Sequence, residues 1–398
     1  MNNNDPKATQ ASSQIWRPAS TVLTVLGLTL AYQTVFALPV GANMAISMKP
    51  ASGGMSGAAF TMPQEVSAAV FGNPATLTQF SGTQFGLGAS ILKIELENTQ
   101  TGAGGTNVSD SIADNYVIPD FGFSNQIGEG WVIGAGVQVG AGLGADFRDD
   151  PVRVGALAGT ELPFTSELLS FNANLSIAKQ ITPSTSIGAT ATVGFGLLQL
   201  GTTGESGPDI PTGQFGGTTA SVHDTGARFS LGITQQVSET IVLSALYKSK
   251  LKYEFEDVTF TTVAPEGFQT LTVEQPAEYV LGAAMHLSPL WLVEIDIQRN
   301  LWGDASTYQD IYEDQTIFML GTQYTLGDWR FRLGYSHQSD QFREEPNNSI
   351  NSLHGLGSIP LPFVGNDLIK IVQTASAPVV SSDSLSLGIG YNISSSAR

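Results

Sequence analysis

The chain contains no cysteine and only four histidines among its 398 residues. Without cysteine there is neither a disulfide nor a thiolate that could bind a metal or attack a substrate. The histidines are His223, His286, His337 and His354. Their spacing does not match that of metal ligands on one helix or hairpin. We therefore expect no metal site, no cofactor and no catalytic residues, and the chain is not predicted to be an enzyme.

Basic residues are also scarce. The chain has 17 Lys and Arg against 35 Asp and Glu, which gives a formal net charge of −18. Nucleic acids and anionic lipid surfaces are bound through basic patches, so neither is an expected partner. After the N-terminal region no stretch has the roughly 20 consecutive apolar residues of a membrane-spanning helix.

The N-terminal region has the three parts of a secretory signal peptide. Lys7 and Arg17 precede a short apolar core at residues 21–31, and Ala37 is the small residue that signal peptidase requires. We predict a signal peptide at residues 1–37 and therefore an exported protein. The alternative is a membrane anchor helix, for which the apolar core is short.

Three segments begin with a tryptophan directly after a tight turn and then alternate apolar and polar side chains. They start at Trp131, Trp291 and Trp329. Because successive side chains of a strand point to opposite faces, each segment is predicted to be a strand with one apolar face. A tryptophan at the same end of each apolar face is typical of the aromatic girdle of a membrane barrel. A soluble antiparallel sheet with one solvated face has the same alternation and is the alternative at this point.

Twelve segments fit a strand by the same test. They are residues 83–94, 116–126, 131–139, 171–177, 187–195, 228–233, 241–248, 278–287, 291–298, 316–326, 329–335 and 385–393. Along the chain, short connections between these segments alternate with long polar loops. The long loops lie at roughly 95–115, 144–168, 200–226, 254–276, 303–315 and 338–383. Short turns at one end and long loops at the other are typical of an outer-membrane barrel, whose short turns are periplasmic. We predict an all-β fold, a transmembrane antiparallel β-barrel built from residues 83–398.

Residues 38–82 lack this alternation and precede the first predicted strand. Thr61 and Gln64 have the spacing of a capping box, and Glu65 carries the charge that suits a helix N-terminus. The predicted short helix starts at this box, with Pro63 in its first turn and Val66, Ala69 and Val70 on its apolar face. It ends before the Asn-Pro pair because proline disfavours helix at the preceding residue. We expect this segment to be a hatch that fills the barrel lumen. The alternative is a disordered periplasmic tail.

Six stretches of the chain together carry a likeness to a known family. They are residues 51–59 (ASGGMSGAA), 67–75 (SAAVFGNPA), 131–147 (WVIGAGVQVGAGLGADF), 246–252 (LYKSKLK), 289–302 and 328–335. In order and spacing they resemble the FadL/TodX-type outer-membrane transporters. The second stretch ends in Asn73, Pro74 and Ala75, which match the Asn-Pro-Ala motif of that family's N-terminal hatch. The third stretch is similar to its kinked third strand.

The resemblance implies a 14-stranded barrel, plugged by the hatch, in the outer membrane of a Gram-negative bacterium. It implies a monomer that contacts membrane lipid and lipopolysaccharide and that the barrel assembly machinery inserts. Its ligand would be a long-chain fatty acid or a hydrocarbon, caught by the outer loops and passed on without energy coupling. The ligand would leave sideways through a kink in the third strand, past a hatch that gates its passage.

The resemblance also assigns roles to particular residues. The turn Asn73-Pro74-Ala75 is either a hinge that couples hatch movement to ligand or a rigid turn that holds the hatch in place. The glycines of the third strand either open the wall or only curve it, since glycine tolerates a bulge and has no side chain to block a hole. These glycines are Gly140, Gly142 and Gly144.

Two further groups are candidates for contact with the ligand. The apolar residues Leu356, Ile359, Leu361 and Phe363 of the last long loop suit a hydrophobic capture patch or a lid. An anionic head group would need a base, and Arg228, Arg330 and Arg332 have lumen-facing parity. The alternative for these arginines is an internal charge network with acids such as Glu278, Glu294 and Asp296.

The strongest competing functions are a general diffusion porin and a structural outer-membrane protein. A porin needs no hatch, so the segment at residues 38–82 argues against it. The twelve predicted strands fall short of the family's fourteen, and residues 394–398 do not supply a terminal aromatic residue. We expect a barrel whose last hairpin is missing; a twelve-strand barrel that closes at residues 385–393 is the alternative.

Overall fold

The computed structural model describes the chain from Lys49 to Ile393, with gaps. The described residues are 49–93, 95–102, 105–154, 160–163, 165–201, 216–261, 267–306, 308–309, 312–341 and 382–393. The predicted signal peptide and the predicted capture residues Leu356, Ile359, Leu361 and Phe363 lie outside them. Among the described helices, none combines the length and the apolar character needed to cross a membrane.

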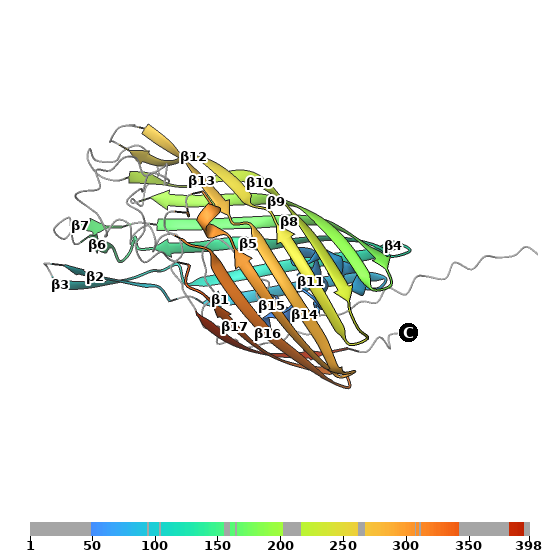
Figure 1. Cartoon of the computed structure of the whole chain (residues 1–398). Coiled ribbons are helices and arrows are strands. Elements are labelled where there is room, and N and C mark those ends of the chain that lie inside the picture. Colours follow the sequence, from blue (N-terminus) through green and yellow to red (C-terminus); the bar gives the residue numbers. More distant parts are fainter. Residues whose placement is uncertain are drawn as a thin grey trace, which may run out of the picture.

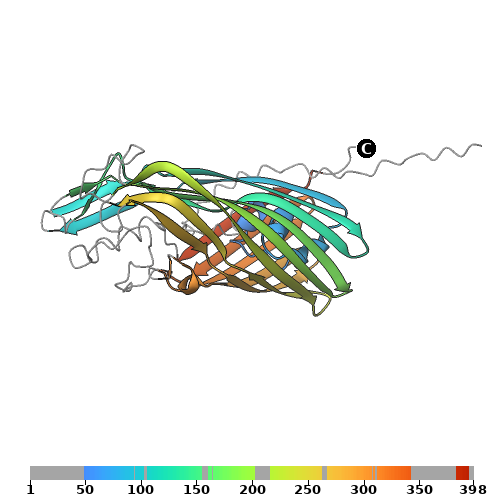
Figure 2. The same ribbon diagram turned by 90° about the horizontal axis from the view of Figure 1, so that it is seen from above.

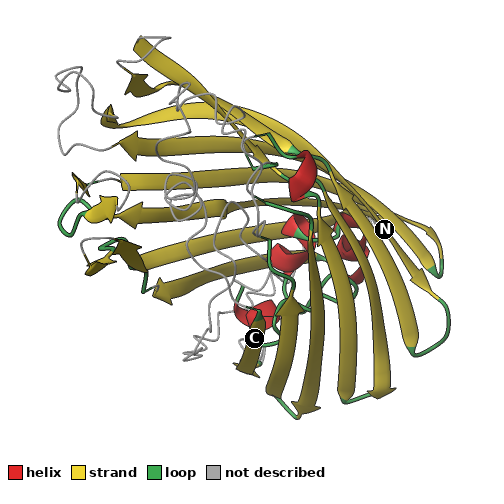
Figure 3. Cartoon of the chain, turned by 60° about the vertical axis from the view of Figure 1, so that its left-hand side comes forward, coloured by secondary structure: helices red, strands yellow, loops and turns green. Residues whose placement is uncertain are grey.

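Twelve antiparallel strands follow one another in a single curved wall (Figures 1 and 3). In the order of the wall they are β1 (Thr83–Lys93), β4 (Asn115–Gly128), β5 (Trp131–Asp146), β8 (Thr165–Thr182), β9 (Thr185–Gly201), β10 (Gly216–Gln236), β11 (Ile241–Lys248), β14 (Glu278–Ser288), β15 (Trp291–Asn300), β16 (Gln315–Leu326), β17 (Trp329–Gln338) and β18 (Asp383–Tyr391). These are the twelve segments that alternation predicts. The all-β antiparallel fold is confirmed.

The two faces of the wall have the reverse of the polarity of a soluble sheet. On β15, Ile295 and Ile297 point outward and are 40% and 48% exposed, whereas Glu294 and Asp296 point inward and are fully buried. The same inversion recurs along the other strands, where outward leucine, isoleucine and phenylalanine side chains oppose buried inward serine, threonine and asparagine. An apolar outer band around a polar interior is the arrangement of a membrane barrel, because lipid replaces the missing core.

The connections separate into two ends, as predicted. Short turns join β4 to β5, β8 to β9, β10 to β11, β14 to β15 and β16 to β17 at one end. The strands that begin at Trp131, Trp291 and Trp329 all start there, and their indole rings lie exposed on the outer face. The tryptophans therefore form a girdle at the short-turn end.

The long connections contain more β-structure than the prediction of polar loops indicates. Two of them hold short hairpins beyond the wall, β2 (Glu97–Gly102) with β3 (Gly105–Asp110) and β6 (Val152–Val154) with β7 (Thr160–Leu162). A third holds β12 (Leu251–Thr261) and β13 (Gly267–Gln275), of which β12 pairs with the outer end of β10. Figure 2 shows these hairpins at the end opposite the short turns. The prediction of loops here was wrong, because alternation continues beyond the wall.

The wall has an open seam between its first and last strands. Among the described residues β1 pairs only with β4, and β18 pairs only with β17. The described part of the chain thus contributes twelve strands to the wall, against the fourteen that the family resemblance implies. The short helix α1 (Pro50–Gly53) contacts both edges of the seam from inside. A Cβ atom on Gly54, at its C-terminus, would lie 2.9 Å from Cα of Gly388 on β18.

Residues 49–82 lie inside the curve of the wall (Figure 3), and we call them the hatch. The hatch contains α1, α2 (Val66–Phe71) and the 3-10 helix η2 (Pro74–Gln79). The predicted short helix is present as α2, but it begins at Val66 and not at the predicted capping box, which does not form. Thr61 instead bonds to the wall, Gln64 donates to the carbonyl oxygen of Met62, and the Glu65 carboxylate accepts from backbone nitrogens of α1.

The orientation of the wall predicts a depth-dependent cost of charge on its outer face. Leu320 and Leu326 both point outward on β16, but Leu326 adjoins the short turn and Leu320 lies six residues away from it. We expect Leu320→Arg to destabilise the protein in a bilayer by about 2–4 kcal/mol, and Leu326→Arg by about 0–1 kcal/mol. Urea titration of folding into lipid vesicles measures both. Equal costs at the two positions would contradict this orientation.

Candidate functional site

Two buried carboxylates of the wall hold the hatch through its backbone. On β15, Glu294 accepts hydrogen bonds from the backbone nitrogens of Thr61 (2.7 Å) and Met62 (3.1 Å), and Asp296 accepts one from that of Phe60 (3.1 Å). A buried backbone N–H group without an acceptor is costly, so these hydrogen bonds stabilise the contact between hatch and wall. The sequence suggested that these acids pair with lumenal arginines. They bind the hatch instead, a contact that alternation cannot reveal because it depends on what lies opposite.

Glycines of the inner face let the hatch approach the wall at backbone distance. A Cβ atom on Gly122 would lie 2.6 Å from Cα of Ser67, and one on Gly334 would lie 2.1 Å from the carbonyl carbon of Met55. Similar approaches occur on most strands. The inward glycines close to hatch atoms are Gly86, Gly88, Gly122, Gly134, Gly136, Gly188, Gly232, Gly282, Gly321, Gly334 and Gly388. The alternation of side chains in the sequence places these glycines on the inner face. It does not reveal that the hatch packs against them.

The Asn-Pro-Ala motif forms a tight turn against two of these glycines. The Asn73 side chain accepts a hydrogen bond from the backbone nitrogen of Ala75 (3.1 Å) and donates one to the carbonyl oxygen of Ile233 on β10 (3.3 Å). A Cβ atom on Gly188 would lie 2.5 Å from atoms of Pro74 and Ala75, and one on Gly232 would overlap the Asn73 side chain. The motif thus forms a turn that contacts the wall, and whether it also acts as a hinge stays a prediction.

The wall parts between β4 and β5. Their ladder runs from the short turn only as far as the pair Asp120–Gln138, whereas β5 and β8 stay paired to Asp146. We call the unpaired stretch between residues 115–119 and 139–145 the window. Within the window the Tyr116 hydroxyl reaches across to Gly144, where a Cβ atom would lie 3.2 Å from it. Beyond the window the backbone nitrogen of Ile112 donates to the carbonyl oxygen of Asp146 (3.0 Å).

The glycines predicted for the third strand lie along one side of the window. Gly140 is the extra residue of a bulge, where the register with β8 shifts between Val139 and Ala141. A Cβ atom there would overlap the side chain of Asn172, so the bulge needs glycine. Gly142 and Gly144 continue the strand in regular pairing with β8. Only the first of the three glycines thus bends the strand.

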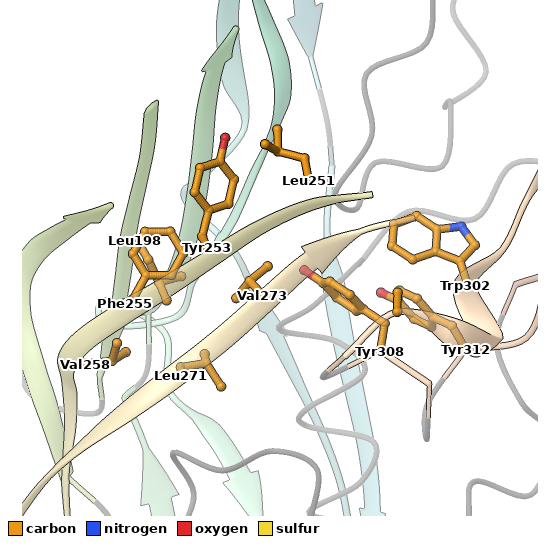
Figure 4. Close-up of a cluster of buried hydrophobic side chains, with 11 residues drawn as sticks. Leu198, Leu251, Tyr253, Phe255, Val258, Leu271, Val273, Trp302, Tyr308 and Tyr312 are labelled. Atoms are coloured by element: carbon orange, nitrogen blue, oxygen red, sulfur yellow. The ribbon is translucent and has the colours of Figure 1, made fainter. Parts of the chain in front are cut away.

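An apolar cluster of buried side chains forms where β12 pairs with the long-loop end of β10 (Figure 4). It joins the β12–β13 hairpin to residues of the β15–β16 connection, which begins with the 3-10 helix η4 (Trp302–Asp304). Its buried members are Leu198, Leu251, Tyr253, Phe255, Val258, Leu271, Val273, Trp302, Ala305, Tyr308 and Tyr312. The Tyr308 and Tyr312 rings stack at 5.1 Å, and Trp302 packs edge-on against both. Burial raises the pKa of both tyrosine hydroxyls, so the cluster is uncharged.

The sequence does not predict this cluster, because residues 254–276 have the composition of a polar loop. The signal was present, since Leu251, Tyr253 and Phe255 alternate with charged residues along β12. Both Leu251 and Tyr253 pack on glycines of the wall, and a Cβ atom on Gly194 would overlap the Tyr253 hydroxyl.

Arg228 lies in a buried charge network at the foot of the cluster. It donates to Glu278 (3.1 Å), which Lys248 also contacts (3.3 Å). Within the described ranges two cations thus contact this carboxylate. Arg228 Nε and the side-chain nitrogen Nε2 of Gln275 are buried and have no hydrogen-bond partner in the described part of the chain. Unsatisfied donors beside a surplus positive charge are complementary to an anion.

The other two candidate bases lie toward the short-turn end of the wall. Arg330 donates to the carbonyl oxygens of Gly327 and Trp329 in its own turn. Arg332 donates to the side chain of Gln323 (2.8 Å), beneath the hatch. Neither is near the apolar cluster. No group of acidic and histidine side chains with the geometry of a metal site occurs within the described ranges.

Comparison with known proteins agrees with this geometry. Residues 44–350 match the model of a family described as outer membrane protein transport protein (OMPP1/FadL/TodX). The chain belongs to this family. It is therefore an outer-membrane β-barrel, and the family is one of transporters of hydrophobic compounds rather than of enzymes. No curated protein sequence gives a significant match.

Solved structures share the fold at low sequence identity. The Pseudomonas putida toluene transporter TodX has a TM-score of 0.57 and 22% identity, over 83% of this chain and 84% of TodX. The Ralstonia pickettii toluene transporter TbuX has a TM-score of 0.54 and 24% identity, over 74% and 86%. A Pseudomonas aeruginosa FadL homologue has a TM-score of 0.60 and 14% identity, over 78% and 83%.

The glycine contacts predict that the hatch tolerates no side chain at its closest approaches. We expect Gly122→Ala to destabilise the protein by about 1–3 kcal/mol, because its Cβ meets hatch backbone that has no room to move. Gly128→Ala is the matched control on the same strand, since nothing lies within 4 Å of its Cβ. Chemical denaturation of the refolded protein measures both. Equal stabilities of the two variants would contradict this packing.

Proposed function

We propose that this protein admits hydrophobic molecules from outside at the apolar cluster and releases them sideways into the membrane through the window. The ligands are long-chain fatty acids and comparable hydrocarbons, and passage needs no energy source in the barrel. The observation that carries the proposal is the early end of the β4–β5 ladder, beside a β5–β8 ladder that continues. Related structures of toluene transporters and of a FadL homologue support the ligand class.

The apolar cluster and the window adjoin each other. The Tyr253 hydroxyl bonds to that of Ser170 on β8 (2.6 Å), and Ser170 is the cross-strand partner of Ala141 beside the bulge. Leu168, partly buried against the cluster, is the partner of Leu143 on the same side of the window. A ligand can therefore leave the cluster for the window without crossing the polar inner wall.

Sideways release is the favourable direction for an apolar ligand. The inner wall is lined by buried polar groups, and the short-turn end is filled by the hatch. An apolar molecule that left through water would lose about 25 cal/mol for each Å² of surface wetted. A molecule that leaves through the wall enters lipid directly and avoids this cost.

In this proposal the body of the hatch stays bound to the wall, and side chains at its edge gate the window. Two carboxylates hold residues 60–62, and the turn at Asn73 is bonded to β10. Movement of the whole hatch would break these bonds together, whereas a shift of side chains at the edge breaks few. A porin function is not favoured, since the hatch occupies the lumen that a porin keeps open.

Arg228 is the proposed first contact for an anionic head group. Arg228 Nε and Gln275 Nε2, which have no partner among the described residues, favour an additional acceptor beside the cluster. A carboxylate supplies such acceptors in the paired geometry that guanidinium prefers. A neutral hydrocarbon would occupy the cluster without using them.

Blocking the window tests the proposal. Val139 is buried at the bulge of β5, and Val139→Trp is expected to reduce uptake of a labelled fatty acid and of toluene to the level of cells without the protein. Val193→Trp is the matched control, since Val193 is exposed on the outer face of β9. Normal uptake by folded Val139→Trp protein would contradict release through the window. Sugar flux through the wild-type protein would indicate a porin.

A further inference from the structure

Lys49, the residue before α1, is a buried base at the edge of the hatch. Its side chain is almost fully covered, at 3% exposure. The ammonium nitrogen Nζ donates to Oε1 of Gln138 on β5 at 2.5 Å and lies 4.5 Å from the centre of the Phe71 ring of α2. Lys49 thus reaches from the hatch to the wall.

Its contact with the wall is at the sill of the window. Gln138 pairs across the strands with Asp120, and this pair is the last rung before β4 and β5 part. This rung is the edge of the window, so Lys49 lies beside the exit route that we propose. Lys49 is therefore the hatch base placed closest to the exit among the described residues.

The ammonium group has more donors than it has protein acceptors. Lysine offers three N–H donors, and the amide of Gln138 is the acceptor that the described residues provide, with the Phe71 ring as a weaker partner. A buried ammonium is costly unless it is paired and hydrogen-bonded. The unused donors at this position are available to a ligand.

The nearby acids leave room for such a ligand. Glu65 is engaged by the backbone nitrogens of Ala51 and Ser52 in α1. Asp120 is buried, its Oδ1 has no hydrogen-bond partner, and no ion pair joins it to Lys49 within 4 Å in the described structure. Asp120 therefore attracts the ammonium from a distance and repels an anion that approaches it.

We propose that Lys49 binds the carboxylate head of a hydrophobic ligand at the sill while the apolar chain passes through the window. This proposal rests on the proposed function and adds a second binding position for the carboxylate, after Arg228. The carboxylate accepts hydrogen bonds from the N–H groups of Nζ that have no acceptor among the described residues. No covalent bond is made or broken. Repulsion by Asp120 weakens the contact and so permits release. Lys49 is a specificity residue that favours carboxylates over neutral ligands of the same length.

The test compares palmitate with its methyl ester, which has the same chain but no charge. In Lys49→Met the acid-to-ester ratio of binding affinity and of uptake rate is expected to fall about tenfold, as for loss of one charge-assisted hydrogen bond. Lys49→Arg retains the ratio because it keeps the charge. Asp120→Asn raises the ratio because it removes the repulsion.

Lys179→Met is the matched control. Lys179 also lies over an aromatic ring, that of Trp131 at 4.8 Å, but on the outer face near the short turn. Its removal is expected to leave the ratio unchanged. An unchanged acid-to-ester ratio in Lys49→Met would overturn the proposal, whether uptake of both ligands falls equally or does not fall. An equal fall would indicate that Lys49 holds the hatch in place. Failure of the proposed function itself is distinct, since wild-type protein would then take up neither ligand.

Discussion

The close contact between the hatch backbone and the inner wall is the constraint on which the rest of the structure depends. Wall glycines remove the side chains that would hold the hatch away, and Glu294 and Asp296 then bind its exposed N–H groups. The contact closes the short-turn end of the lumen and bridges the seam between β1 and β18. With that end closed, exit of an apolar ligand through the window is the route that we propose.

Much of the wall could be predicted from the sequence, because alternation is local. The outward isoleucines of β15 and the tryptophans at the short turns follow from period two and from turn residues. The contacts of Glu294 and of Gly122 could not be predicted, because they depend on hatch residues more than fifty positions away. The capping box at Thr61 failed for the same reason, since the wall supplied a better partner.

The site was predicted in part. The family resemblance directed attention to Gly140, and the structure places the bulge there. The window itself depends on where β4 and β5 stop pairing, a property of two strands that neither segment reveals alone. The apolar cluster and Lys49 were missed, the first because a hairpin was taken for a loop and the second because its burial comes from tertiary contacts.

A hatch fixed to the wall during transport is the central claim, and a disulfide tests it most directly. The hydroxyls of Ser56 in the hatch and Ser386 on β18 lie 2.8 Å apart, and the chain has no other cysteine to interfere. The double variant Ser56→Cys and Ser386→Cys, oxidised, pins the hatch. We expect fatty-acid uptake equal to that of the reduced protein. Uptake that stops on oxidation and returns on reduction would contradict the account.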